Sequence, residues 1–127
     1  MSDAASLRIR VSKRFQFDAA HHFEHEADGH PFSRLHGHSF EGLVELEGVA
    51  DPRTGFVEDL WRVEAALQAV VETLDHRLLN EVEGLGPPSL EHLALYVFNR
   101  LKPTLAQLSA VEIGRPSCGE RARIEAQ

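Results

Sequence analysis

The sequence has very little cysteine, a shortage of positive charge and no long apolar run. Cys118 is the only cysteine among 127 residues, so an intramolecular disulfide and a zinc cluster built on several thiolates are both excluded. Acidic residues outnumber basic ones by 20 to 13, and the net charge of −7 argues against nucleic acid or a membrane as a partner. No apolar run approaches membrane-spanning length, and the N-terminus lacks the apolar core of a signal peptide. We therefore expect a cytoplasmic protein.

The rest of the composition is that of an ordinary folded domain. Hydrophobic residues make up 43% of the chain and charged residues 26%, which is typical of a protein with one buried core. No repeat, low-complexity tract or linker divides the chain. We therefore expect a single domain over residues 1–127.

Two long segments alternate between apolar and polar residues, as half-buried strands do. In residues 7–19 the apolar side chains fall mainly on odd positions, and in residues 36–48 they fall on even positions. Continuing these alternations places His21 on the apolar face of the first strand, and His36 and His38 on the apolar face of the second. Asp28-Gly29 and Pro31 mark the segment between the strands as an irregular loop.

Two further segments repeat apolar residues at helical spacing. The first runs from about Leu60 to about Leu74; the second begins after Ser89, a plausible N-cap, and stops before Pro103. Residues 109–113 suggest a third strand, and residues 121–125 a weaker fourth. The order ββααββ predicts an α+β fold in which two helices cover one face of an antiparallel sheet.

His21, His36 and His38 are the first candidate site. Residues two apart on a strand point to the same face, so His36 and His38 can offer two imidazoles to one metal ion, and His21 on the neighbouring strand can supply the third. Three protein ligands with one open position are typical of catalytic zinc. Histidines that are solvent-facing or simply hydrogen-bonded are the alternative.

Two other polar groups each have two interpretations. Asp75-His76 follows the first predicted helix, where a histidine interacts favourably with the helix dipole; alternatively, the carboxylate orients the imidazole for proton transfer. Ser89 and Glu91 are explained by helix capping and first-turn electrostatics. Taken alone, these residues indicate a structural role.

Together, the motifs resemble the 6-pyruvoyl-tetrahydropterin synthase family, and most of all the bacterial 6-carboxytetrahydropterin synthases of the queuosine (7-deazaguanine) pathway. The resemblance rests on Phe-Asp-Ala-Ala-His at residues 17–21, Leu-His-Gly-His at 35–38, the turn and helix start at 51–59, Leu-Asp-His-Arg-Leu-Leu-Asn at 74–80 and Pro-Ser-Leu-Glu at 88–91. These segments come in family order and spacing, and the similarity covers roughly residues 7–113.

The resemblance implies the tunnelling fold, or T-fold, in which ββααββ subunits associate into barrels, commonly hexamers made of two trimers with active sites between subunits. It implies a Zn²⁺-dependent lyase that converts a small pterin-like substrate, dihydroneopterin triphosphate, to 6-carboxytetrahydropterin. The residues that match the family's functional positions are the zinc ligands His21, His36 and His38, the catalytic proton relay Asp75 and His76, and the substrate-binding Ser89 and Glu91.

Two positions depart from the family pattern. The family's catalytic cysteine stands four residues before His36, where this chain has Phe32. The family's Glu-Thr pair, whose carboxylate binds the 2-amino edge of the pterin, aligns with Arg115-Pro116. Glu112 cannot replace that carboxylate, because a shift of three residues along a strand reverses the face. We therefore expect Phe32 and Arg115 to line an altered substrate pocket.

These departures leave other functions open. One is an enzyme of the same fold that acts on a different pterin- or purine-like substrate; another is a non-catalytic ligand-binding homologue. Candidates for a proton carrier in place of the missing thiol lie in the loop before the second strand: Glu24, Glu26 and His30.

Overall fold

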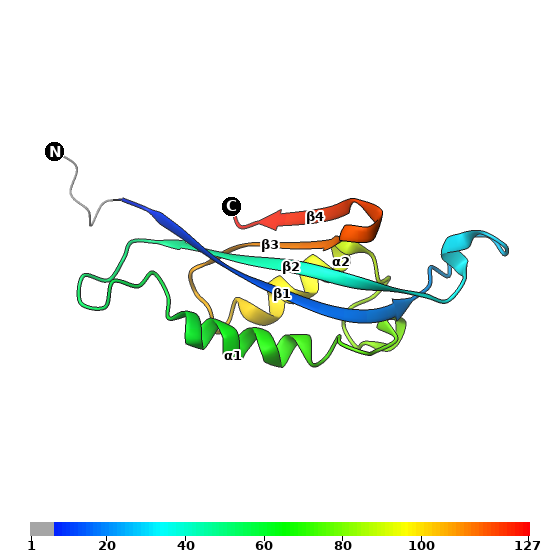
Figure 1. Cartoon of the computed structure of the whole chain (residues 1–127), viewed down its shortest axis with the longest axis horizontal. Coiled ribbons are helices and arrows are strands. Elements are labelled where there is room, and N and C mark those ends of the chain that lie inside the picture. Colours follow the sequence, from blue (N-terminus) through cyan, green and yellow to red (C-terminus); the bar gives the residue numbers. More distant parts are fainter. Residues whose placement is uncertain (1–6) are drawn as a thin grey trace.

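The computed structural model describes residues 7–127. Within this range, four antiparallel strands form one sheet in the order β1-β2-β3-β4, and two helices lie against one of its faces (Figure 1). The strands are β1 (Ile9–His21), β2 (His36–Gly48), β3 (Leu108–Arg115) and β4 (Glu120–Glu125), and the helices are α1 (Leu60–Val71) and α2 (Leu90–Leu101). The predicted ββααββ order and the antiparallel sheet are confirmed.

β1 and β2 pair along their whole length, and this register positions the histidines. His21 lies directly opposite His36, Ala19 opposite His38, and Phe17 opposite Phe40. Residues opposite each other on paired strands project to the same face of the sheet. The loop between them extends beyond the end of the sheet in Figure 1.

The core lies between the sheet and the helices. The odd positions of β1 and the even positions of β2 face it, as the alternation predicts: Phe17 is 3% exposed, and Phe40 and Val44 are 0% exposed. Other completely buried side chains come from both helices and from the segments that follow them: Val63, Leu74, Leu79, Leu93, Val97 and Leu105. His21, also 0% exposed, is the one buried polar or charged residue among those described, so the histidine site borders this core.

α1 ends earlier than its apolar pattern predicts. It ends at Val71, with Glu72 as C-cap, although Leu74 continues the apolar spacing and is fully buried. The chain tightens after the helix through hydrogen bonds three residues apart, from Thr73 N–H to the Val70 carbonyl and from Leu74 N–H to the Val71 carbonyl. Such bonds satisfy the last carbonyls of a helix while keeping side chains on nearly the same face. The prediction to about Leu74 was therefore wrong for the helix, but correct for the buried face.

The opposite face of the sheet is charged. Arg123 on β4 contacts Glu45 on β2 at 2.9 Å and Glu112 on β3 at 3.0 Å, and Arg121 also contacts Glu112 at 2.9 Å. Glu112 therefore projects away from the helices, as the strand parity predicts. Within residues 7–127, no helix has the length and apolar character needed to cross a membrane.

Candidate metal centre

His21, His36 and His38 converge at the end of the paired strands β1 and β2. One ring nitrogen from each residue can be chosen so that all three atoms lie within 4.8 Å of one another. His21 is fully buried, whereas His36 and His38 are partly buried. The ring centroid of His21 lies 4.6 Å from that of His36 and 5.1 Å from that of His38. The predicted convergence of three imidazoles is confirmed.

Backbone carbonyls orient two of the rings. Nδ1 of His21 lies 3.0 Å from the Pro88 carbonyl oxygen, and Nδ1 of His36 lies 2.7 Å from the Arg34 carbonyl oxygen. A carbonyl only accepts hydrogen bonds, so each Nδ1 carries the proton and donates it. The lone pair of each ring then belongs to Nε2. This is the usual arrangement of a metal-binding histidine, whose other nitrogen is held by a carbonyl or carboxylate.

The Nε2 atoms of His21 and His38 are buried and have no hydrogen-bond partner among the described residues. A buried polar atom without a partner costs about 1–3 kcal/mol, and a bound cation would remove that cost. The donor set therefore fits a metal ion held by three imidazoles.

Burial and neighbouring positive charge favour the neutral form of the His21 and His38 imidazoles. Burial is the main cause that lowers the pKa of His21 from 6.5 to about 4; the hydrogen bond to Pro88 opposes this shift, and the neighbouring histidines add to it. The pKa of His38 is also lowered, first by burial and then by the positive charge of Arg115. Neutral imidazole is the form that binds metal, so these groups are ready to act as ligands at neutral pH.

Aromatic side chains surround the imidazoles. The ring centroid of His21 lies 4.9 Å from that of Phe23 and 5.9 Å from that of Phe40. Phe32, in a short 3-10 turn (Pro31–Ser33), lies 6.4 Å from His36 between ring centroids and is 45% exposed. The phenyl ring predicted to occupy the pocket thus borders the histidine cluster while reaching solvent.

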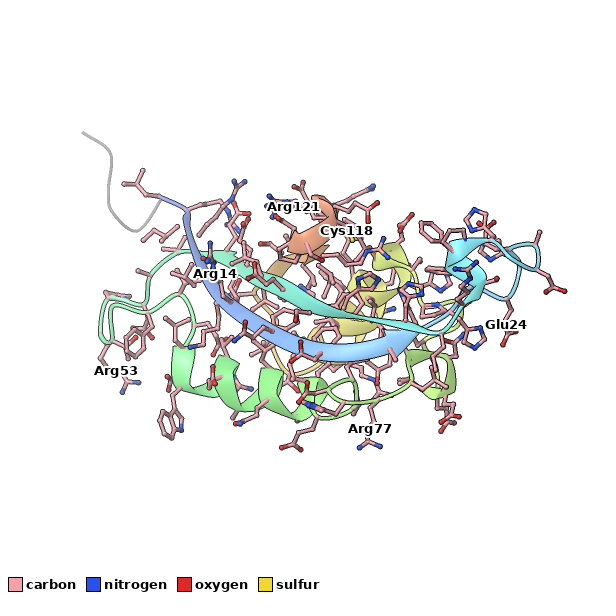
Figure 2. The ribbon with its side chains drawn as sticks, turned by 45° about the vertical axis from the view of Figure 1, so that its right-hand side comes forward. Arg14, Glu24, Arg53, Arg77, Cys118 and Arg121 are labelled. Atoms are coloured by element: carbon pink, nitrogen blue, oxygen red, sulfur yellow. The ribbon has the colours of Figure 1, made fainter. Side chains whose placement is uncertain are left out.

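The loop that carries Phe32 holds its polar groups in local contacts. His30 Nδ1 accepts a hydrogen bond from the Phe32 N–H at 3.0 Å, and His30 Nε2 lies 3.6 Å from a carboxylate oxygen of Glu26. Glu24 is exposed on the loop beyond the end of β1 (Figure 2). The contacts of His30 and Glu26 are therefore with loop neighbours.

Arg115 extends along the inner face of the sheet toward the histidines. It follows Ile113 by two residues on β3, so it shares the helix-facing side, and its side chain is only 12% exposed. Its charge lowers the pKa of both His21 and His38. Nη2 contacts Glu120 Oε1 at 2.9 Å, and Nε is buried without a partner in the described part of the chain. Arg115 therefore enters the site as half of an ion pair.

Two residues near the site were missed by sequence reasoning. Glu120 lies opposite Arg115 in the pairing of β3 with β4, and Cys118 lies on the turn between these strands (Figure 2). Although it is 80 residues away in the chain, Cys118 Sγ is 4.0 Å from His38 Nδ1. The available signal was the predicted hairpin of the third and fourth strands, because a tight turn places Cys118 and the first residue of β4, Glu120, beside the end of β3.

Asp75 and His76 form a hydrogen-bonded pair beside the outer edge of β1. Nδ1 of His76 lies 2.9 Å from Asp75 Oδ2, while Asp75 Oδ1 accepts the Asp18 N–H at 2.9 Å. The Asp18 hydrogen bond and then the His76 contact lower the pKa of Asp75, and Asp75 in turn raises the pKa of His76. The His76 side chain is 79% exposed, so the pair is open to solvent or to another subunit.

The same pair lies beyond the end of α1, not at its last turn. His76 has a left-handed backbone with φ of 58°, and its N–H donates to the Asp18 carbonyl at 2.6 Å. The helix-dipole interpretation is therefore the weaker one, because the dipole acts only within the last turn. An open hollow of about 610 Å³ is lined by residues that include Asp18, His38 and His76.

Ser89 is the N-cap of α2, as predicted, and its Oγ accepts the His92 N–H at 3.1 Å. Glu91 lies in the first turn of the same helix and is exposed. The residue before the cap, Pro88, supplies the carbonyl that orients His21. The segment is thus both a helix start and a support for the histidine cluster.

Comparisons with known proteins place the chain in one family. A model described as 6-pyruvoyl tetrahydropterin synthase matches residues 10–127. The chain is 34% identical over 119 residues to the 6-carboxy-5,6,7,8-tetrahydropterin synthase of Synechocystis sp., covering 89% of this chain and 90% of that protein. It is 33% identical over 99 residues to the dihydroneopterin monophosphate aldolase of Pyrococcus furiosus, covering 78% and 80%.

The fold is likewise similar to solved structures. The 6-pyruvoyl tetrahydropterin synthase of Caenorhabditis elegans superposes with a TM-score of 0.83 at 25% identity, covering 95% of this chain and 97% of that one. The corresponding Plasmodium vivax protein gives a TM-score of 0.73 at 17% identity, covering 96% and 99%. The predicted T-fold architecture of the subunit is thereby confirmed.

Proposed function

Because the chain belongs to the 6-pyruvoyl tetrahydropterin synthase family, whose members are pterin-processing enzymes, we propose that it is a zinc-dependent lyase of the 6-carboxytetrahydropterin synthase type. Its substrate would be dihydroneopterin triphosphate and its product 6-carboxytetrahydropterin, in a cytoplasmic 7-deazaguanine (queuosine) pathway. The observation that carries this proposal is the set of three converging imidazoles, two with buried and unpartnered Nε2 atoms.

His21, His36 and His38 would hold the metal through Nε2. Three imidazoles suit zinc better than the oxygen-seeking ions magnesium and calcium. Held by these three residues, a zinc ion would supply Lewis-acid chemistry toward an oxygen of the substrate. This chain's own contribution is to fix two of the rings through the Pro88 and Arg34 carbonyls.

Substrate recognition is assigned to the Arg115–Glu120 pair. An unpaired Arg115 would repel the amino and ring N–H edge of a pterin, since a guanidinium offers only donors. Glu120 compensates that charge through Oε1, and its Oε2 can accept an N–H from the substrate. We assign to Glu120 the acceptor role that Arg115 cannot fill, with Arg115 orienting the carboxylate. Ser89 and Glu91 remain candidates for further substrate contacts.

Proton transfer is assigned to His76. Asp75 holds the Nδ1–H of the ring at 2.9 Å, which leaves Nε2 free to exchange a proton with a bound molecule. The raised pKa of His76 increases the protonated fraction near neutral pH, which favours a role as general acid. The exposure of this side chain suits a site completed by a neighbouring subunit.

A homo-oligomer, most simply a hexamer of two trimers, would provide that neighbour. β1 and β4 are the outer strands of the sheet, and open strand edges are usually paired or covered. Asp18 and Ala20 on the β1 edge already bond to residues 75–77. Pairing β4 of one subunit with the earlier part of β1 in the next would close a barrel and bring another chain close to the exposed His76.

A second candidate is an aldolase acting on a dihydroneopterin phosphate. Two observations favour it: a phenylalanine, Phe32, borders the histidines where the family cysteine is expected, and the chain is similar to the Pyrococcus furiosus aldolase. The metal ligands and the Asp75–His76 pair would serve either reaction, because both require proton transfer at the side chain of a reduced pterin.

One assay distinguishes these functions. Zinc-loaded protein is incubated separately with dihydroneopterin triphosphate and dihydroneopterin monophosphate, and the products are resolved by chromatography, with His36→Ala as the inactive control. Release of 6-carboxytetrahydropterin from the triphosphate supports the first proposal, and cleavage of only the monophosphate supports the second. Zinc binding without turnover of either compound would contradict both enzymatic proposals and favour a non-catalytic, ligand-binding protein.

A further inference from the structure

The three histidines of the metal centre differ in how their Nδ1 atoms are held. His21 and His36 each have a backbone carbonyl oxygen within 3.0 Å. The Nδ1 atom of His38 instead faces Cys118, whose Sγ lies 4.0 Å away. Within the described part of the chain this thiol is the hydrogen-bond partner found for that nitrogen, and the Nε2 atom of the same ring is buried and unpartnered.

The β3–β4 hairpin determines the place of Cys118. The short 3-10 turn Pro116–Cys118 ends at Gly119, which has φ of 68° and donates its N–H to the Pro116 carbonyl at 3.1 Å. Glycine adopts this left-handed conformation at little cost, whereas most residues do not. The turn therefore presents the thiol to His38 on a constrained backbone.

A second observation shows that a ligand belongs at this place. His21 is 0% exposed, yet its Nε2 has no partner among the described residues. One ring nitrogen from each of the three histidines can be chosen so that all three lie within 4.8 Å of one another. The two nitrogens of one imidazole ring point in different directions, so only one of them can face a metal ion. With Nε2 of His38 facing the metal position, the sulfur beside Nδ1 lies outside the coordination shell.

We propose that Cys118 is a positioning residue of the metal centre, whose sulfur accepts the Nδ1–H of His38 and thereby directs the Nε2 lone pair of that ring toward the metal. The inference rests on the metal site of the proposed function. Cys118 thus does for His38 what the Pro88 and Arg34 carbonyls do for the other two ligands. The sulfur does not ligate the metal.

The size of the effect follows from the weakness of the contact. Removing an outer hydrogen-bond partner of a ligating histidine typically lowers metal affinity by about 10- to 100-fold. A thiol is a weak acceptor and the distance is long, so the expected loss is at the lower end, about 10-fold. Serine at this position keeps a hydroxyl acceptor and should retain most of the affinity.

The test measures metal binding, not turnover. Zn²⁺ affinity is determined by competition with a chromophoric chelator for wild type, Cys118→Ala, Cys118→Ser and His36→Ala, with Ser12→Ala, at an exposed residue of β1, as the control. The expected result is about a 10-fold weaker affinity for Cys118→Ala, a smaller loss for Cys118→Ser and none for Ser12→Ala. Circular dichroism and thermal unfolding of the metal-free proteins verify that each variant is folded.

A spectroscopic measurement separates positioning from ligation. Co²⁺ replaces Zn²⁺, and the near-ultraviolet spectrum is recorded for wild type and Cys118→Ala. A positioning sulfur predicts no thiolate-to-cobalt band in either protein, together with a changed ¹⁵N signal of His38 Nδ1 in the variant. A thiolate band that Cys118→Ala removes, or equal Zn²⁺ affinity of the two proteins, would overturn the inference. Wild type that binds no more Zn²⁺ than His36→Ala would instead overturn the metal site, and the proposed function with it.

Discussion

Protonation of His21 should destabilise the metal-free protein in a defined pH window. Its pKa falls from 6.5 to about 4 on folding, mainly because the ring is buried. Between pH 4 and pH 6.5, His21 is therefore mostly neutral in the folded protein and mostly protonated in the unfolded chain. The unfolded state binds more protons in this pH range. By linkage, stability is complete above about pH 6.5, decreases as the pH falls, and stops decreasing from this group below about pH 4.

The magnitude follows from the shift. Each pKa unit corresponds to about 1.4 kcal/mol, so His21 alone should remove roughly 3 kcal/mol between the two pH limits. The ring is 0% exposed, which means that solvent screening reduces this figure little. His38 acts in the same direction, because its pKa is also lowered.

The assay is chemical unfolding in the presence of a metal chelator, followed by circular dichroism at several pH values between 7 and 4. The comparison is between wild type, His21→Gln, which cannot titrate, and His25→Gln, a matched change at an exposed histidine. Carboxylates also titrate in this range, but they contribute equally to all three proteins. His21→Gln should lose less stability than wild type on acidification, and His25→Gln should behave as wild type. Equal pH slopes for wild type and His21→Gln would refute the reasoning.

Five further substitutions test other parts of the molecule. His36→Ala should abolish stoichiometric Zn²⁺ binding in metal analysis while the protein remains folded; full zinc retention would contradict the ligand assignment. Glu120→Gln should weaken pterin binding in calorimetry and Arg115→Glu should weaken it too, because two facing carboxylates replace an ion pair; unchanged affinity in both would contradict the recognition role. Asp75→Asn should lower kcat by about 10²- to 10⁴-fold with little change in KM, and an unchanged kcat would exclude the relay. Leu93→Ala, at a side chain that is 0% exposed, should reduce the free energy of unfolding by about 2–5 kcal/mol, measured by urea titration.

Much of the site could be predicted because it depends on strand parity. His36 and His38 are two residues apart on one strand, and the alternation of β1 carries His21 to the same face. Because side chains alternate between the two faces of a strand, burying one face fixes the face on which every other side chain of that strand lies. Ser89 was equally predictable as a cap, since its preference for helix N-termini arises from its own side chain.

The parts that could not be predicted depend on contacts between segments far apart in the chain. The Pro88 carbonyl orients His21 across 67 residues, and Cys118 meets His38 across 80. No local pattern encodes such a contact, because each partner is an ordinary backbone carbonyl or side chain until the fold brings it into reach. The environment of Arg115 was also unpredictable for this reason. A lone arginine would repel the N–H edge of a pterin, but the side chain of Glu120, its cross-strand neighbour, compensates the charge.

The sequence by itself therefore determined the sheet, the helix-covered face and the three imidazoles that share it, since periodicity and burial act along a single segment. The tertiary structure alone decided which nitrogen of two of these imidazoles is free, which charge accompanies Arg115 and where the single thiol lies. The physical reason is that orientation and charge compensation require a partner at hydrogen-bond distance, and only the packing of β1, β2, α2 and the β3–β4 hairpin supplies it.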